Sequence, residues 1–430
     1  MYYRNVAFQD LTPSVPHPVM LAQQIKKTPM NLACACIIRK SNQFHAADRF
    51  FLLEMGGKNH YTIPFIHEHV FSAVRRSTSK PLPMLCRPFW HFILKGFIEM
   101  TVTDLINKGI NGQTLTPQEI EYLLSFPPHS AQSFQMMSAA SDLARQLQNN
   151  EAEVHGQLAL NLAPCPEECQ FCSFAKSNKI FTKATEVPID EAVAMAKQFE
   201  DAGCQAIGLM TTANFPFKKI APYLTAIRQV VKKETPLIVN IGDQCADHAE
   251  ELVQLGVNGV YHALRLREGI DTNIPPQQRR DSIEKFQKAG LQLGVCVEPL
   301  GPEHSDKEIA EMIYYTARLN PVFSGAARRI PIPGTRMGEL GTIPEIRQAQ
   351  VVAVTRLAMP HATIANCTHE PGVLPGMGGA TFFWAEMGAN PRDTIARTEE
   401  GRAHNVSKLE TMFWELDWEI QRGPSRIWKV

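Results

Sequence analysis

From about Ser130 onward, short apolar runs alternate with longer amphipathic segments. Runs such as AIGLMT (206–211) and LIVNIG (237–242) are apolar throughout, as strands buried on both faces are. Helical patterns such as 189–202 and 277–290 separate them. The alternation predicts a parallel sheet with helical crossovers. The expected strands are 158–163, 206–211, 237–242, 259–264, 291–298, 326–332 and 362–367, with a last β/α unit in 379–392.

Seven or eight such repeats over about 270 residues match the size of a (β/α)8 barrel of the TIM type. The predicted fold class is therefore α/β, with a helical segment before the barrel. There, Thr116-Pro117-Gln118-Glu119 carries N-cap, proline and acidic first-turn signals for a helix over 119–125, and a second helix is expected over 130–149. We divide the chain into an N-terminal extension of doubtful structure (1–99), N-terminal helices (100–150), the barrel (151–400, its closing region at about 360–400) and a helical tail (401–430).

The first 99 residues differ from the rest of the chain. They contain few periodic segments, and they mix basic and proline residues with aromatic ones. Met100 then opens a stretch that resembles an ordinary protein start. Two interpretations follow: an extension or upstream sequence with Met100 as the working start, or an accessory domain.

Composition excludes several classes of protein. The chain has 430 residues, with 43 Lys+Arg balanced by 43 Asp+Glu, and 44% are hydrophobic, which excludes an intrinsically disordered chain. A neutral total gives no support for a nucleic-acid partner. The N-terminus lacks the pattern of a secretory signal, and no apolar run approaches the length of a membrane-spanning helix. We expect a cytoplasmic protein without a membrane partner, in a reducing setting.

Three of the ten cysteines lie close together in the sequence. Cys165, Cys169 and Cys172 form a C-x3-C-x2-C pattern directly after the first expected barrel strand, where the active sites of such barrels lie. Three thiolates in one loop can bind three irons of a cubane iron–sulfur cluster and leave the fourth iron open. Zinc is the rival, but no second Cys or His pair follows nearby.

The stretch CPEECQFC, with an aromatic residue before its third cysteine, resembles the C-x3-C-x-φ-C motif of the radical S-adenosylmethionine (SAM) superfamily. The resemblance implies a [4Fe–4S] cluster held by Cys165, Cys169 and Cys172, with SAM as the second cofactor. It also implies an enzyme that reductively cleaves SAM to a 5′-deoxyadenosyl radical, which abstracts hydrogen from a small-molecule substrate. An electron donor such as flavodoxin or ferredoxin would be a partner.

Further stretches resemble the biotin synthase-like branch, which includes biotin synthase, the [FeFe]-hydrogenase maturase and methylornithine synthase. The helix containing Arg279 resembles one whose arginine contacts SAM, and Arg265-Leu266-Arg267-Glu268 resembles a stretch that holds the amino-acid end of SAM. The SAM candidates implied are Phe171, Thr211, Thr212, Arg265, Arg267, Glu268 and Arg279. A surface face of ion pairs is the alternative for the charged ones. No residue is assigned a catalytic role.

The chain also departs from biotin synthase itself. The stretches that match its three additional cysteines and its arginine supply none of them in register, which disfavours sulfur insertion. Cys296 and Cys367 lie on or at the end of expected strands, so a second cluster and two buried free cysteines both stay open. A non-catalytic zinc or iron–sulfur scaffold is the remaining alternative. We expect polar residues near strand ends to line the cavity: Asn161, Asn240, Asp243, His262, Arg328, Arg329, Asn366, His369 and Glu370. Of these, Arg328-Arg329 suggests an anionic or amino-acid-like substrate.

Overall fold

The computed structural model describes residues 37–40, 50–55, 59–64 and 101–430, in two compact units that divide at Ile98 and Glu99. In the first unit, three strands form an antiparallel sheet in the order β1 (Ile37–Lys40), β2 (Phe50–Met55) and β3 (Asn59–Pro64). Most of the expected N-terminal extension lies outside the described residues. Whether residues 1–99 are an extension or an accessory domain, and whether Met100 is the working start, therefore stay predictions.

The second unit begins with three helices, α4 (Val102–Ile110), α5 (Pro117–Leu124) and α6 (Ala131–Gln148). The start of α5 follows the expected signals: the Thr116 hydroxyl accepts from the backbone N–H of Glu119, and the Glu119 carboxylate accepts from that of Thr116 at 2.7 Å. This reciprocal cap satisfies two backbone donors at the helix end, with Pro117 at the first helical position.

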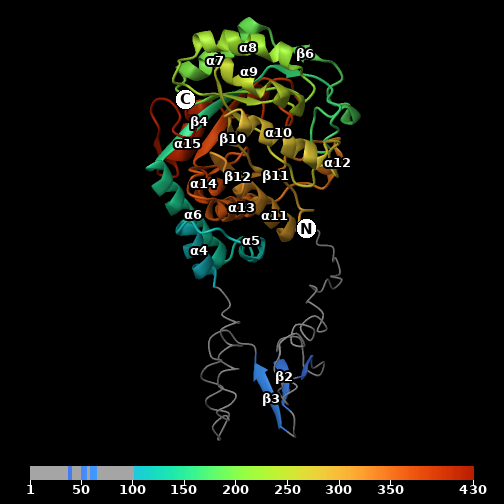
Figure 1. The fold of residues 1–430 in the computed structure, drawn as a ribbon, viewed down its shortest axis with the longest axis vertical. Coiled ribbons are helices and arrows are strands. Elements are labelled where there is room, and N and C mark those ends of the chain that lie inside the picture. The colour runs from blue at the N-terminus through green and yellow to red at the C-terminus, as the bar shows by residue number, and fades with distance from the viewer. Residues whose placement is uncertain (1–36, 41–49, 56–58, 65–100) are drawn as a thin grey trace, which may run out of the picture. The chain divides into compact units, whose positions relative to one another are not determined.

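Eight parallel strands then close into a barrel, as predicted (Figure 1). The fifth strand is interrupted, and its first half pairs with the following strand, which completes the circle. The strands are β4 (Glu151–Ala159), β7 (Ile207–Met210), β8 (Leu237–Asn240), β9 (Val257–Tyr261), β10 with β11 (Gln292–Gly294 and Val297–Leu300), β12 (Phe323–Arg328), β13 (Ala365–Cys367) and β14 (Phe382–Met387).

The first strand begins seven residues earlier than the pattern predicts, at Glu151 instead of 158. Its alternating Glu153, His155 and Gln157 are polar, yet all three are buried. Glu153 accepts hydrogen bonds from His155 at 2.7 Å and from the backbone N–H of Arg426 at 2.8 Å. Hydrogen bonds inside the barrel therefore allow polar residues to form part of a buried strand. A search for apolar runs does not detect such residues as a strand.

Helices cover the outside of the barrel between successive strands (Figure 1). The expected crossovers over 189–202 and 277–290 match the observed helices to within a few residues. They are α7 (Ile189–Asp201), α8 (Phe217–Val230), the 3-10 helix η3 (Asp243–His248) with α9 (Ala249–Gln254), α10 (Pro276–Lys288), α11 (Asp306–Ala317), α12 (Arg336–Glu339), α13 (Glu345–Ala358) and α14 (Val373–Met377). Short elements complete the unit: β5 (Asn161–Leu162), β6 (Thr185–Glu186), η2 (Lys176–Asn178) and η4 (Thr398–Glu400).

The C-terminal tail closes the end of the barrel at which the strands begin. Only α15 (Val406–Trp414) is helical, and β15 (Glu419–Ile420) pairs with the start of β4. Beyond it, Ser425 hydrogen-bonds to Glu153, and the ring of Trp428 lies 5.5 Å from that of Phe323, the first residue of β12. A tail expected to be helical thus places an indole in the barrel core.

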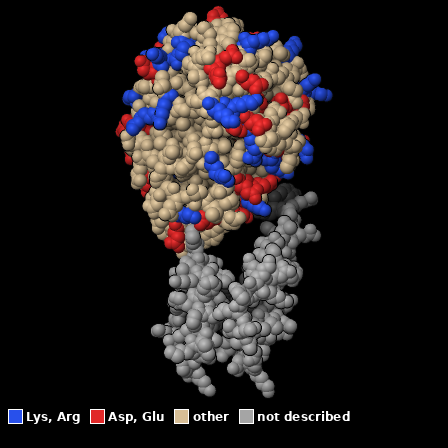
Figure 2. All heavy atoms as spheres, viewed as in Figure 1, with Lys and Arg blue, Asp and Glu red and all other residues tan. Residues whose placement is uncertain are grey.

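Charged side chains of both signs are intermingled on the face shown in Figure 2. Among the described residues, no helix has the length and apolar character needed to cross a bilayer.

Candidate functional site

The three clustered cysteines lie in a loop that follows β4 and β5, at the end of the barrel where the strands finish. The loop is tied to itself, because the backbone N–H of Cys165 donates to the carbonyl of Phe174 at 2.7 Å and that of Cys172 to the carbonyl of Cys169 at 3.0 Å. It is also tied to the segment after β9, through the N–H of Gln170 and the carbonyl of Asp271 at 2.9 Å. Its backbone is therefore held from two sides.

The environment of the three thiols suits metal binding better than free thiolates. Burial raises the pKa of each: that of Cys172 rises to about 12, and those of Cys165 and Cys169 rise as well. In each case a neighbouring thiol or carboxylate of the loop adds to the rise, because the groups lie close enough to repel each other's charge. Bound metal removes this obstacle because it replaces the proton, so the donor set fits an iron–sulfur cluster.

Arg265 lies beside this loop, next to two carboxylates. Its backbone N–H donates to Glu268 at 3.1 Å, and its Nε lies 3.8 Å from Glu298. Although burial opposes its charge, Glu268, Glu298 and Cys169 raise the pKa of the guanidinium. Arg265 is therefore a fixed cation among carboxylates at the edge of the cysteine loop.

Arg279, from α10, also approaches Glu268, with its Nε 3.5 Å from the carboxylate. Its Nη1 contacts Asp243 at 3.1 Å and His262 at 3.0 Å. Despite burial, His262 and Arg279 hold the pKa of Asp243 well below its usual range, whereas burial and Arg279 lower that of His262 to about 4. Arg279 thus links Glu268 to the pair formed by Asp243 and His262, and its nearest partners are these protein side chains.

Arg267 points to a different set of partners. Its Nε lies 3.8 Å from Asp271 and 3.8 Å from Glu308 of α11, and its backbone has a positive φ of 56°. This is the arrangement expected of an ion-paired face. The structure therefore brings Arg265 and Glu268 to the loop together and directs Arg267 elsewhere.

The uncharged SAM candidates are Phe171, Thr211 and Thr212, and the two threonines differ in whether the hydroxyl has a hydrogen-bond partner. The hydroxyl of Thr212 is buried and accepts a hydrogen bond from Asn161 at 2.7 Å, so this side chain has a partner within the fold. The buried hydroxyl of Thr211 has none among the described residues. Phe171 is half-buried within the cysteine loop.

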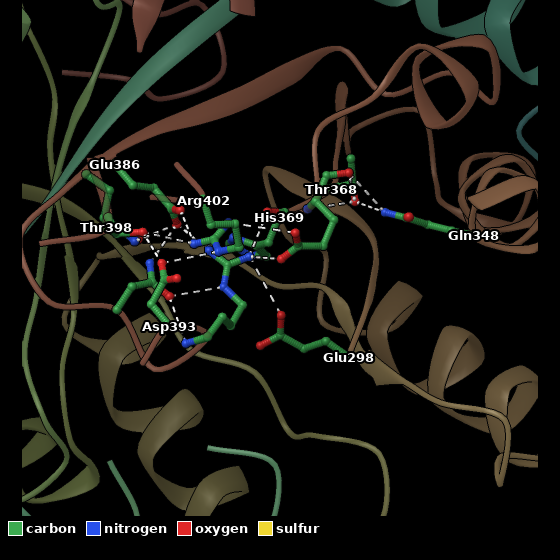
Figure 3. Close-up of polar contacts among 12 residues, drawn as sticks. Glu298, Gln348, Thr368, His369, Glu386, Asp393, Thr398 and Arg402 are labelled. Atoms are coloured by element: carbon green, nitrogen blue, oxygen red, sulfur yellow. Dashed lines mark hydrogen bonds and ion pairs between the residues drawn. The ribbon is translucent and has the colours of Figure 1, made fainter. Parts of the chain in front are cut away.

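A second buried charged group lies at the end of β14 (Figure 3). Glu386 accepts hydrogen bonds from Arg402 at 2.7 Å and from Arg392, and Arg392 also donates to Glu370 at 2.7 Å. Although burial opposes ionisation, the two guanidinium groups lower the pKa of Glu386. The sequence prediction missed Arg392 and Arg402, because they lie in loops beyond β14. In the sequence, the signal available was that both follow Glu386 within the same region.

The two arginines after β12 have different surroundings. Arg329 is buried, and it binds Glu303 at 3.0 Å and the carbonyl of Gly341 at 2.9 Å. The half-buried side chain of Arg328 makes no hydrogen bond or ion pair with any described residue. Of this pair, Arg328 is therefore the one left available to an anion.

Comparisons with known proteins found relatives in sequence and in fold. Residues 164–314 match the family model of the radical SAM superfamily. Biotin synthase from Mycolicibacterium paratuberculosis (strain ATCC BAA-968 / K-10) is 24% identical over 315 residues, which are 70% of this chain and 89% of that protein. Biotin synthase from Rhodococcus jostii (strain RHA1) is 23% identical over 284 residues, 65% of this chain and 80% of that protein.

Two solved structures share the fold. Methylornithine synthase (PylB) superimposes with a TM-score of 0.61 at 14% identity, over 74% of this chain and 97% of that one. HydG, a maturase of the [FeFe]-hydrogenase, superimposes with a TM-score of 0.61 at 16% identity, over 73% of this chain and 74% of that one. The cysteine loop thus lies at the start of the segment that matches the radical SAM family model, on a barrel similar in fold to those of PylB and HydG.

Proposed function

We propose that this protein binds a [4Fe–4S] cluster through Cys165, Cys169 and Cys172 and cleaves SAM to initiate hydrogen abstraction from a small-molecule substrate. The observation that carries the proposal is the position of the three thiols, in one doubly tied loop at the carboxyl ends of the barrel strands, beside Arg265. When bound and reduced, such a cluster supplies the electron that splits SAM into methionine and a 5′-deoxyadenosyl radical.

The protein side chains near the loop have the charges that the amino-acid end of SAM requires. A carboxylate is best recognised by a guanidinium, and an ammonium group by a carboxylate. Arg265 offers the first, and Glu298, whose carboxylate lies 3.8 Å from Arg265, offers the second. The backbone-bound Glu268 and the buried Arg279 would fix the orientation of this pair instead of contacting the ligand. The free hydroxyl of Thr211 is a further donor, and the ring of Phe171 a surface for the adenine.

Arg328 is the described guanidinium at the strand ends that lacks an internal partner, which favours an anionic or amino-acid-like substrate. We do not propose sulfur insertion, because the additional cysteines of biotin synthase have no counterparts in register.

Anaerobic reconstitution with iron and sulfide tests the proposal. The expected result is a spectrum of a [4Fe–4S] cluster, with about four irons and four sulfides per chain, and 5′-deoxyadenosine when the reduced protein meets SAM. The Cys169→Ala variant should lose both. Cys204→Ala is the matched control, because Cys204 is also buried but lies after α7, outside the loop.

A cluster spectrum that survives in the Cys165→Ala/Cys169→Ala/Cys172→Ala variant would overturn the ligand assignment. One zinc ion per chain without acid-labile sulfide would favour a scaffold over an enzyme of this kind. In Arg265→Lys, the cluster should form normally while the KM for SAM rises, since a bidentate guanidinium is replaced by a point charge.

A further inference from the structure

A second set of metal-binding side chains meets inside the barrel, on different strands from the cysteine loop. Cys296 lies between β10 and β11, Cys367 ends β13, and His369 follows two residues later. One ligand atom from each lies within 4.8 Å of the other two, and all three side chains are buried. Among the described residues, this is the group of cysteine, histidine and carboxylate side chains that lies close enough to hold one ion.

The strand between the two cysteines is built to let them meet. Val297 is paired with Ala326, and Gly325 with Cys367, so Gly325 of β12 lies between Cys296 and Cys367. Its φ is +142°, and a Cβ at this position would overlap the carbonyl oxygen of Cys367. Any residue other than glycine would therefore distort β13 where it presents its thiol.

The third side chain, His369, has a buried ring nitrogen without a hydrogen-bond partner among the described residues. Its buried Nε2 makes no hydrogen bond within the described part of the chain, although buried polar atoms are normally paired. The ring is held on two sides, by Tyr261 edge-on at 4.9 Å and by Trp384 stacked at 6.5 Å. The imidazole is thus fixed in orientation without having its nitrogen satisfied.

The spacing selects one chemical class of occupant. In a tetrahedral zinc site with Zn–S bonds of about 2.3 Å, two sulfurs lie about 3.8 Å apart, within the observed limit. A disulfide fits less well, because the two cysteines are separated by two strand spacings, roughly 9 Å, whereas bridged Cα atoms lie about 4.4–6.8 Å apart. A two-iron cluster needs a fourth ligand on the far side of its second iron, which this group does not supply.

We propose that Cys296, Cys367 and His369 bind one divalent ion of the zinc class, independently of the cluster at Cys165, Cys169 and Cys172. Three protein ligands leave the fourth tetrahedral position to a water or a substrate atom, as in catalytic zinc sites. Glu298 is the nearest carboxylate, 3.8 Å from His369 Nε2, and its other oxygen lies 3.8 Å from Arg265. The ion would therefore sit one carboxylate away from the proposed SAM site.

The test separates the two sites by removing the first. In the full chain carrying Cys165→Ala/Cys169→Ala/Cys172→Ala, titration with Co²⁺ should give about one bound ion, with a thiolate charge-transfer band and the intense visible bands of a tetrahedral site. Adding Cys296→Ala, Cys367→Ala or His369→Gln should weaken binding by more than about 100-fold, because loss of even an outer partner costs about 10–100-fold. Adding Cys204→Ala instead should change nothing.

Two further measurements keep the outcome decisive. Zn²⁺ should raise the unfolding temperature of the Cys165→Ala/Cys169→Ala/Cys172→Ala variant, the triple-alanine protein. It should not raise the unfolding temperature of the same protein with His369→Gln added. Far-ultraviolet circular dichroism checks that each variant is folded. Absence of a cobalt band, or binding that survives Cys367→Ala in a folded protein, would overturn the proposal. Acid-labile sulfide in the triple-alanine protein would show an iron–sulfur cluster in place of a single ion.

Discussion

The C-terminal tail places Trp428 in the end of the barrel where the strands begin, which we call the barrel floor. The contribution of this residue to stability can be predicted and measured. Trp428 is 1% exposed, beyond the last strand β15. A tryptophan buries about 150–250 Å², and at about 25 cal/mol per Å² this contributes roughly 4–6 kcal/mol as an upper bound. We therefore expect Trp428→Ala to lower the free energy of unfolding by about 3–5 kcal/mol.

Gly259 of β9 makes the test specific. A Cβ at Gly259 would overlap the indole ring of Trp428, and its φ is not positive, so alanine would otherwise suit this strand. Gly259→Ala should therefore destabilise the protein by about 1–3 kcal/mol, as overpacked core positions do. In the Trp428→Ala background the steric conflict with the indole is gone, and the same substitution should cost at least about 1 kcal/mol less.

The assay is urea unfolding of the cofactor-free protein, followed by circular dichroism, for the wild type, both single variants and the double variant. Tryptophan fluorescence is unsuitable because one variant removes a tryptophan. Additive losses would refute the reasoning, since they would mean that the indole does not occupy the space above Gly259. A residual cost in the double variant is expected, because the added Cβ also approaches the carbonyl of Gln292.

Two further predictions concern the buried charges. Arg392→Met should cost about 3–5 kcal/mol in unfolding free energy, because it leaves Glu370, Glu386 and Asp393 with Arg402 as their shared cation. Glu386→Gln should cost distinctly less, because Glu370 still pairs with Arg392, and Asp393 lies 3.4 Å from Arg402. Equal losses in urea unfolding would contradict this assignment. His262 has a folded pKa of about 4, below its ordinary 6.5, so the unfolded chain takes up its proton first and stability should fall as pH falls from 6.5 to 4. His262→Gln should flatten the dependence of the unfolding temperature on pH over that range, and an unchanged slope would show that other groups cause it.

Much of the architecture was predictable because it is written in local patterns. Apolar runs of strand length separated by amphipathic helices indicate a parallel barrel, since only strands covered on both faces can be apolar throughout. The cap at Thr116 and the spacing of Cys165, Cys169 and Cys172 are local as well, and they were recognised without tertiary information. The boundaries of β4 were not, because its inward side chains are polar and are satisfied by residues far away in the chain.

By itself, then, the sequence determined the fold class, the cysteine spacing that resembles the radical SAM motif, and the set of charged residues from which a site could be built. Only the tertiary structure decided which of those charges meet: Arg265 reaches Glu298, Arg267 turns to Glu308, and Arg329 is taken by Glu303. It also brought Cys296, Cys367 and His369 together, and it placed Trp428 in the barrel floor. The reason is physical: periodicity and capping depend on neighbours within a few residues, whereas these pairings depend on the register of strands that are distant in the chain.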